Sequence, residues 1–129
     1  MKKTIVLLLI FTIILAAINT VYADTTADDV FDSMVAVLNS QKSVSFTFRS
    51  SAPITSISFH TCELQELTNN GWDTISSNLT PSFNLSTGYV INATLNCSGD
   101  ISTGTYRIKY KVTANNHTTS FHYSNSHSY

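Results

Sequence analysis

Strict alternation of apolar and polar side chains over residues 105–114 is the feature that most constrains this chain. Every second position there is apolar: Tyr106, Ile108, Tyr110 and Val112. The positions between them carry a basic row: Arg107, Lys109 and Lys111. A period of two is typical of a β-strand with one buried face and one solvated face. Such a strand needs a second layer of structure to cover its apolar side.

The same period recurs upstream. Val44, Phe46 and Phe48 alternate with polar residues, and residues 89–97 alternate in the same way. A further extended run over residues 54–67 changes phase within itself: Ile57 and Phe59 are in step, whereas Cys62 and Leu64 are displaced by one residue. A β-bulge near His60 and Thr61 would reconcile the two halves.

Turn-forming clusters separate these runs at residues 68–71, 98–100 and 115–116. About seven short strands with such spacing predict an all-β fold, an antiparallel two-sheet immunoglobulin/fibronectin-III-like sandwich. Tyr106, which opens its strand directly after Gly104 and Thr105, is expected to form a tyrosine corner. Trp72, the only tryptophan, follows a turn and is predicted to plug the core, with a ligand-stacking platform as the alternative.

Residues 27–40 allow two interpretations. Thr26 could cap a short N-terminal helix with Asp28 and Asp29 in its first turn. Alternatively, residues 34–38 could form a buried strand paired with residues 44–48. Helix propensity slightly favours the first interpretation, whereas a sandwich needs the second as its first strand.

The N-terminal residues have the pattern of a signal peptide. Lys2 and Lys3 precede an apolar run over residues 5–17, and residues 21–23 supply a cleavage site before Asp24. A retained anchor is the alternative, although the run is shorter than the roughly 20 residues of a spanning helix. We therefore expect a signal peptide (1–23), an acidic segment (24–32), a sandwich domain (33–124) and a polar tail (125–129) that frays.

Cleavage would place the mature chain outside the cell or on the outer face of the cell envelope, without further membrane contact. The mature part holds Cys62 and Cys97, and an even cysteine count in that compartment favours one disulfide. A metal-binding pair or two free thiols are the alternatives.

Charge and motif patterns argue against several functions. Without Lys2 and Lys3, five basic side chains remain against eight acidic ones, a formal net charge of −3. That balance gives little attraction for a phosphate backbone, so nucleic acid is not expected as a partner. Glu63, Glu66 and Asp73 are interpreted as surface carboxylates rather than a catalytic pair.

Histidine is the commonest metal ligand in proteins, so the histidines of this chain are candidate ligands. His117, His122 and His127 recur every five residues, a spacing that alternates the faces of a strand. No metal site, catalytic residue or cofactor is predicted.

Two strings, LQELTNNGWDTI (64–75) and GTYRIKYKVTANNHTTSFHYS (104–124), carry a resemblance. With Leu64, Gln65 and Trp72 in the first and residues 104–107 in the second, the chain resembles small secreted sandwich proteins of Gram-positive bacteria. The likeness covers most of residues 33–124. It implies the immunoglobulin- or fibronectin-like fold with residues 34–38 as a first strand, and it implies no active site. The acidic segment departs from that pattern.

These features together predict a non-catalytic secreted or envelope module that binds a protein or a cell-wall glycan. The basic row of Arg107, Lys109 and Lys111 is the best candidate contact face, with a merely solvated strand face as the alternative. A secreted effector, either a bacteriocin-like toxin or a hydrolase inhibitor, is the second candidate function.

Overall fold

The computed structural model describes residues 30–85 and 88–129. The predicted signal peptide, the proposed cap at Thr26 and residues 24–29 of the acidic segment lie outside the described residues. Within the described ranges the protein is all β, so no helix there could cross a membrane.

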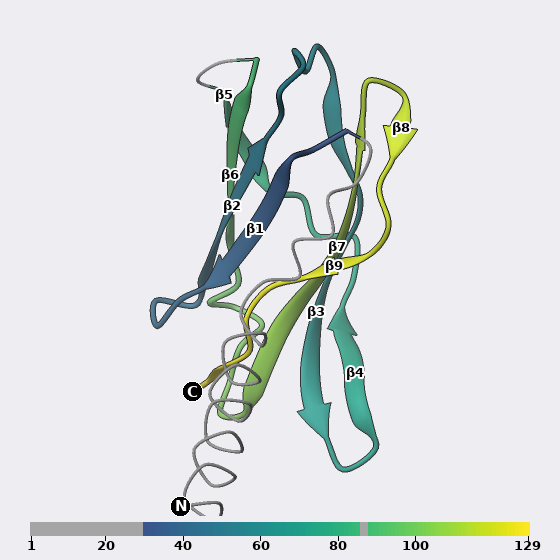
Figure 1. The fold of residues 1–129 in the computed structure, drawn as a ribbon. Coiled ribbons are helices and arrows are strands. Elements are labelled where there is room, and N and C mark those ends of the chain that lie inside the picture. The colour runs from purple at the N-terminus through teal and green to yellow at the C-terminus, as the bar shows by residue number, and fades with distance from the viewer. Residues whose placement is uncertain (1–29, 86–87) are drawn as a thin grey trace, which may run out of the picture.

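Two antiparallel sheets face each other in a sandwich (Figure 1). The four-stranded sheet has the order β1-β2-β6-β5, with bounds β1 Ser33–Leu38, β2 Ser43–Arg49, β6 Val90–Asn96 and β5 Ser82–Leu85. The six-stranded sheet has the order β10-β7-β3-β4, with β8 and β9 also paired to β7. Its bounds are β3 Ile57–Thr68, β4 Gly71–Ser76, β7 Thr105–Ala114, β8 His117–Thr118, β9 His122–Tyr123 and β10 His127–Ser128. The predicted two-sheet antiparallel sandwich is confirmed.

The core lies between the sheets and consists of the apolar side chains that the alternation predicts. The largest fully buried members include Tyr106, Tyr110, Phe46, Phe48, Leu64 and Ile108. Phe46 and Tyr110 meet edge to face across the sandwich, with ring centroids 5.2 Å apart. Rings in that arrangement gain quadrupolar attraction beyond the burial of their apolar area.

Residues 33–38 form a strand, so the helical interpretation of this part of the chain is wrong. β1 pairs with β2 over its whole length, from Ser33 opposite Arg49 to Leu38 opposite Val44. Even-numbered side chains of β1 are buried and odd-numbered ones are not, which is a period of two. Burial against the second sheet therefore outweighs a small helix propensity.

The predicted bulge in β3 is confirmed. Phe59 lies opposite Val112 of β7 and Thr61 lies opposite Lys111, so His60 is the surplus residue. The side chains of Cys62 and Leu64 consequently point into the core. Past this point β3 forms a hairpin with β4, and that hairpin extends beyond the end of the four-stranded sheet (Figure 1).

The last segment of the chain differs from the expectation of a frayed polar tail. Three short strands, β8, β9 and β10, follow one another along the edge of β7. Tyr129 exchanges two backbone hydrogen bonds with Gly104, and its hydroxyl donates to the carbonyl oxygen of Asn39. These bonds tie the polar tail to both sheets, which offsets the entropy that would otherwise make it fray.

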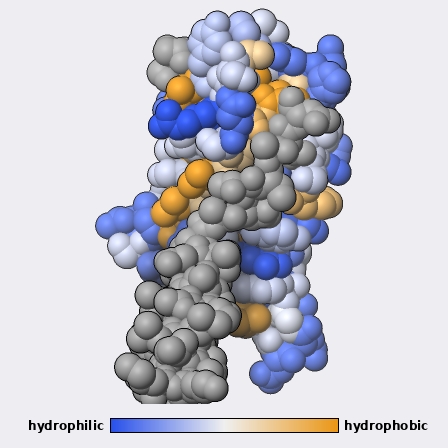
Figure 2. Space-filling view, viewed as in Figure 1, coloured by the Kyte–Doolittle hydropathy of each residue, from blue (hydrophilic) through white to orange (hydrophobic). Residues whose placement is uncertain are grey.

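Figure 2 shows one side of the surface, which is mostly hydrophilic or neutral with a hydrophobic stretch over β1. Val35 and Val37 on this edge strand are nearly half exposed. Other exposed hydrophobic side chains are Leu67, Ile75, Tyr89, Phe121 and Tyr123.

Candidate binding face

Trp72 lies outside the core, so the prediction that it plugs the core is wrong. It is half-buried, and it stands opposite Leu67 in the β3–β4 hairpin, where Leu67 is 48% exposed. Leu67 and Gln65 are two residues apart and share the side of β3 that is opposite to buried Leu64. Trp72 therefore belongs to the outer face of the six-stranded sheet, the face turned away from the other sheet.

Arg107 of the basic row lies between two aromatic rings on this outer face. Its guanidinium carbon is 4.2 Å from the ring centre of Trp72 and 4.2 Å from that of Tyr123. Trp72 comes from β4 and Tyr123 from β9, which lie on opposite sides of β7 in the sheet. The rings thus hold the planar cation from both sides, an arrangement that stabilises it by about 0.5 to 2 kcal/mol for each ring.

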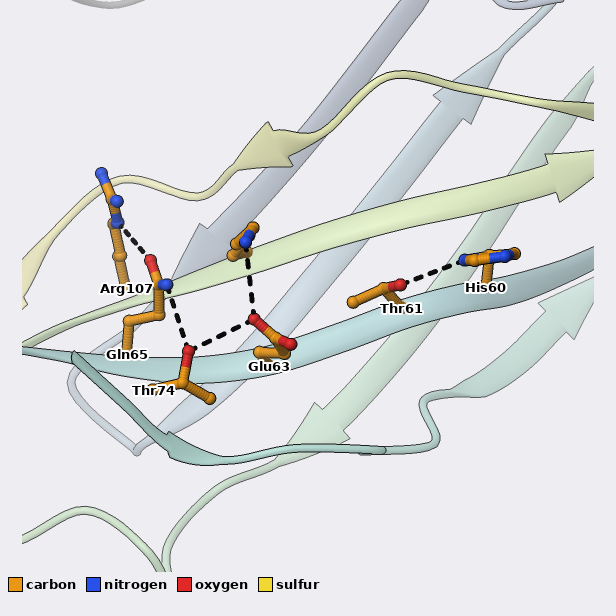
Figure 3. Close-up of polar contacts among 7 residues, drawn as sticks. His60, Thr61, Glu63, Gln65, Thr74 and Arg107 are labelled. Atoms are coloured by element: carbon orange, nitrogen blue, oxygen red, sulfur yellow. Dashed lines mark hydrogen bonds and ion pairs between the residues drawn. The ribbon is translucent and has the colours of Figure 1, made fainter. Parts of the chain in front are cut away.

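A chain of hydrogen bonds also holds the Arg107 side chain, through the Nε–H group that lies in the plane of its guanidinium. Arg107 Nε donates to Gln65 Oε1 at 2.9 Å, and Gln65 Nε2 donates to Thr74 Oγ1 at 3.3 Å. Thr74 in turn donates to Glu63 Oε2 at 3.3 Å. Figure 3 shows these side chains rising from one side of the sheet, from strands β3, β4 and β7. Gln65 is only 6% exposed, so its amide is a rigid support for the cation.

The rest of the basic row is organised around Phe121. Lys109 Nζ lies 4.2 Å from the ring centre of Phe121, and Lys111 Nζ lies 4.7 Å from it. Lys109 also makes an ion pair with Glu63 at 3.7 Å. Phe121 is 41% exposed. The basic row is therefore a set of cations interleaved with aromatic rings rather than a plain solvated face.

We use the name basic-aromatic face for this group, which consists of Trp72, Arg107, Lys109, Lys111, Phe121 and Tyr123. The sequence identified its cations through the alternation in residues 105–114. It did not identify Phe121. A signal was present, because Phe121 and Tyr123 flank buried His122 with a period of two.

Arg107 stays charged within this stack, although its surroundings lower its pKa. Burial lowers the pKa of its guanidinium from the ordinary value, and the neighbouring Tyr123 acts in the opposite direction. An arginine begins from so high a pKa that it stays protonated at neutral pH. The basic-aromatic face therefore carries three cations, and the carboxylate of Glu63 lies beside it in contact with Lys109.

Tyr106 lies on the opposite, inner side of β7 and is 1% exposed. Its hydroxyl accepts a hydrogen bond from the backbone N–H of Ser102, four residues upstream, at 3.3 Å. It also donates to Glu66 Oε1 at 3.3 Å. This is the contact that defines a tyrosine corner, and it fixes the loop that precedes β7.

Cys62 and Cys97 are buried free thiols, so the predicted disulfide is not formed in the structure. Burial raises the pKa of Cys62 from its ordinary 9.0 to about 12, with smaller contributions from Cys97 and Glu63. Burial likewise raises the pKa of Cys97 to about 11, with Asp100 adding to the effect. Both thiols are uncharged at neutral pH and act as small apolar side chains of the core.

The remaining candidate residues are not brought together. Glu63 lies on the outer face with Lys109, whereas Glu66 turns to Tyr106 on the inner side and Asp73 accepts from Thr68 Oγ1 at 2.8 Å. Across residues 30–85 and 88–129, no three side chains of His, Cys, Asp or Glu lie together as metal ligands would.

Comparisons of the chain with protein-family models, with curated proteins and with solved structures gave no match.

Proposed function

We propose that this chain is a secreted or envelope-associated β-sandwich module that acts by binding a partner, without catalysis, through its basic-aromatic face. The observation that carries the proposal is the clamp on Arg107, which two rings and Gln65 hold in one orientation. A guanidinium fixed before a partner arrives loses little conformational entropy on binding. Preorganised sites of this kind are typical of binding surfaces.

The composition of the face supports the same proposal. Arginine and aromatic side chains are the residues most enriched at binding hot spots. Phe121 and Tyr123 are each 41% exposed and lie beside cations. Single exposed hydrophobic residues are ordinary, but a cluster around fixed charges is not.

Secretion is part of this proposal and is supported by the N-terminal sequence pattern. The basic start, the apolar run over residues 5–17 and the small residues before Asp24 match a signal peptide. The resemblance of residues 64–75 and 104–124 to small secreted proteins of Gram-positive bacteria points the same way. Intact mass of the protein from the producing cells should give a chain that begins at Asp24.

Binding is tested by sedimentation with isolated cell envelopes of the producing cells. Purified mature protein should co-sediment, and the triple variant Trp72→Ala/Phe121→Ala/Tyr123→Ala should stay in the supernatant. Val35→Thr/Val37→Thr is a matched control, because it changes exposed side chains on the other sheet and should co-sediment like the parent.

Equal sedimentation of the parent and the triple variant would overturn the assignment of the face. Recovery of the mature chain free in the medium, with no envelope binding, would overturn the proposal in favour of a released effector. Circular dichroism of each variant verifies that the sandwich is intact.

A further inference from the structure

We propose that Arg107 and its two flanking rings form a carboxylate-binding subsite for an acidic glycan, that is, a saccharide chain that carries uronic-acid groups. The inference rests on the proposed function, because it names the partner of the same basic-aromatic face. It follows from which edge of the guanidinium is left accessible.

The contacts of Arg107 leave one edge for a ligand. The ring centres of Trp72 and Tyr123 each lie 4.2 Å from the guanidinium carbon, and the two rings come from strands on opposite sides of β7. The Nε edge donates to Gln65 Oε1. Among the described residues, the two terminal nitrogens at the far end are therefore the part of the cation that is directed to a partner. Figure 3 shows this end of Arg107 rising from the sheet, away from Gln65.

A planar anion with two oxygens fits that edge best. Two parallel N–H groups of arginine match a carboxylate in one plane, with two hydrogen bonds at once. The rings on either side leave a slot in the plane of the guanidinium. A carboxylate lies within such a slot, whereas the additional oxygens of a tetrahedral phosphate would be pushed towards the rings.

The exposed rings suit the sugar that carries the carboxylate. Tyr123 is 41% exposed beside Arg107, and Phe121 is equally exposed two residues away. A sugar ring has an apolar face of C–H groups, which can pack on an aromatic ring while its hydroxyls stay in water. A carboxylate bound at Arg107 would place its own sugar next to Tyr123.

Charge complementarity extends the site along β7. Arg107, Lys109 and Lys111 are spaced by two residues, about 7 Å for each step along a strand. Within residues 30–85 and 88–129, the one carboxylate paired with this row is Glu63, which contacts Lys109, although the mature chain as a whole is acidic. A polymer with repeated negative groups can contact successive cations, which is the arrangement that gives a salt-dependent affinity.

The test is a fluorescence titration of the mature protein with oligogalacturonate, because the single tryptophan is part of the site. Binding should change the emission of Trp72 and should weaken as salt is added. The methyl ester of the same oligosaccharide keeps the sugar but removes the charge, and should bind at least tenfold more weakly. Polyphosphate is the comparison anion and should also bind more weakly.

Variants then assign the binding to Arg107. Arg107→Lys keeps the charge but loses the paired donors, and should lower the affinity for oligogalacturonate about tenfold. Arg49→Gln removes one positive charge from an exposed position on the four-stranded sheet and should change the affinity less than twofold. Thermal melts verify that both variants fold.

The other possible results of these binding experiments would each overturn a different part of the two proposals. Tighter binding of polyphosphate, or equal binding of the methyl ester, would overturn the carboxylate subsite. Envelope binding that depends on the basic-aromatic face, without oligogalacturonate binding, would overturn the glycan inference while leaving the proposed function in place. Loss of both would overturn both.

Discussion

Asn125 satisfies both backbone groups of Leu38 at the outer edge of β1. Its Oδ1 accepts from Leu38 N at 2.8 Å, and its Nδ2 donates to Leu38 O at 3.0 Å. A side-chain amide thus occupies the position that a neighbouring strand would take. Since β1 is an edge strand that carries exposed Val35 and Val37, this contact limits pairing with other chains at one end of the edge.

Replacement of Asn125 by alanine should therefore destabilise the fold. Two hydrogen bonds are lost and two partly buried backbone groups are left without their partner, which costs about 1 to 3 kcal/mol. Urea denaturation measures the loss. Asn70→Ala, at an exposed turn position, is the control and should change the free energy of unfolding by less than about 0.5 kcal/mol. Equal stability of the two variants would contradict the role of Asn125.

A second prediction concerns two glycines in the loop before β7. Gly104 has a φ of +151°, and a Cβ there would lie 2.7 Å from Glu66 Oε1, so Gly104→Ala should cost about 1 to 3 kcal/mol. Gly99 has nothing within 4 Å of such a Cβ, and Gly99→Ala should be neutral or stabilise slightly. Thermal melts of both variants make the comparison. A destabilised Gly99→Ala beside an unaffected Gly104→Ala would refute it.

The position of Trp72 predicts a small effect on stability. Trp72→Ala removes a half-buried ring and one cation–π contact, and should lower the free energy of unfolding by about 1 to 2 kcal/mol. Phe46→Ala leaves a cavity in the core and should lower the free energy of unfolding by about 3 to 5 kcal/mol. Guanidinium denaturation followed by circular dichroism measures both. If Trp72→Ala costs as much as Phe46→Ala, Trp72 is a core residue after all.

The buried thiols predict a loss of stability at high pH. Both have pKa values raised above the ordinary 9.0, to about 12 for Cys62 and about 11 for Cys97. The unfolded state therefore loses these protons first, and the stabilising effect present below pH 9 declines as the pH rises towards 11 and 12. The free energy of unfolding should fall more steeply above pH 9 than that of Cys62→Ala/Cys97→Ala.

Thiol labelling is the companion measurement. Iodoacetamide should modify the native protein slowly and the unfolded protein quickly, because a buried protonated thiol is a poor nucleophile. Absence of labelling even after unfolding, with an intact mass lowered by the hydrogens lost in a disulfide, would show that Cys62 and Cys97 are bridged instead.

Period-two alternation was enough to predict the sheets because burial of one face imposes that period on the sequence. It identified the buried set of β7 and the phase change within β3. The helix alternative for residues 27–40 arose because a short apolar segment fits both periods locally. Pairing of residues 33–38 with β2 decides between the helix and the strand. Helix and strand propensities carry no information about that pairing.

The candidate site was predicted only in part because its geometry depends on neighbours in the sheet. Arg107, Trp72 and Tyr123 are far apart in the chain and meet only through the order β4, β3, β7 and β9. The tail was expected to fray because its residues are polar. Asn125 and Tyr129 are nevertheless ordered, because their side chains form hydrogen bonds with the backbone of Leu38 and Asn39. Amino-acid composition does not show which backbone groups a polar side chain will reach.

His60 has a larger consequence than its exposed position suggests. It is the surplus residue between Phe59 and Thr61 where β3 shifts register against β7. If residue 60 stayed in the chain but β3 paired with β7 without this bulge, the side chains that follow would exchange faces. Cys62 and Leu64 would then point to solvent, and Glu63 and Gln65 would point into the core. The bulge at this one residue thus keeps Cys62 and Leu64 in the apolar interior, and keeps Glu63 and Gln65 on the outer face beside the basic row.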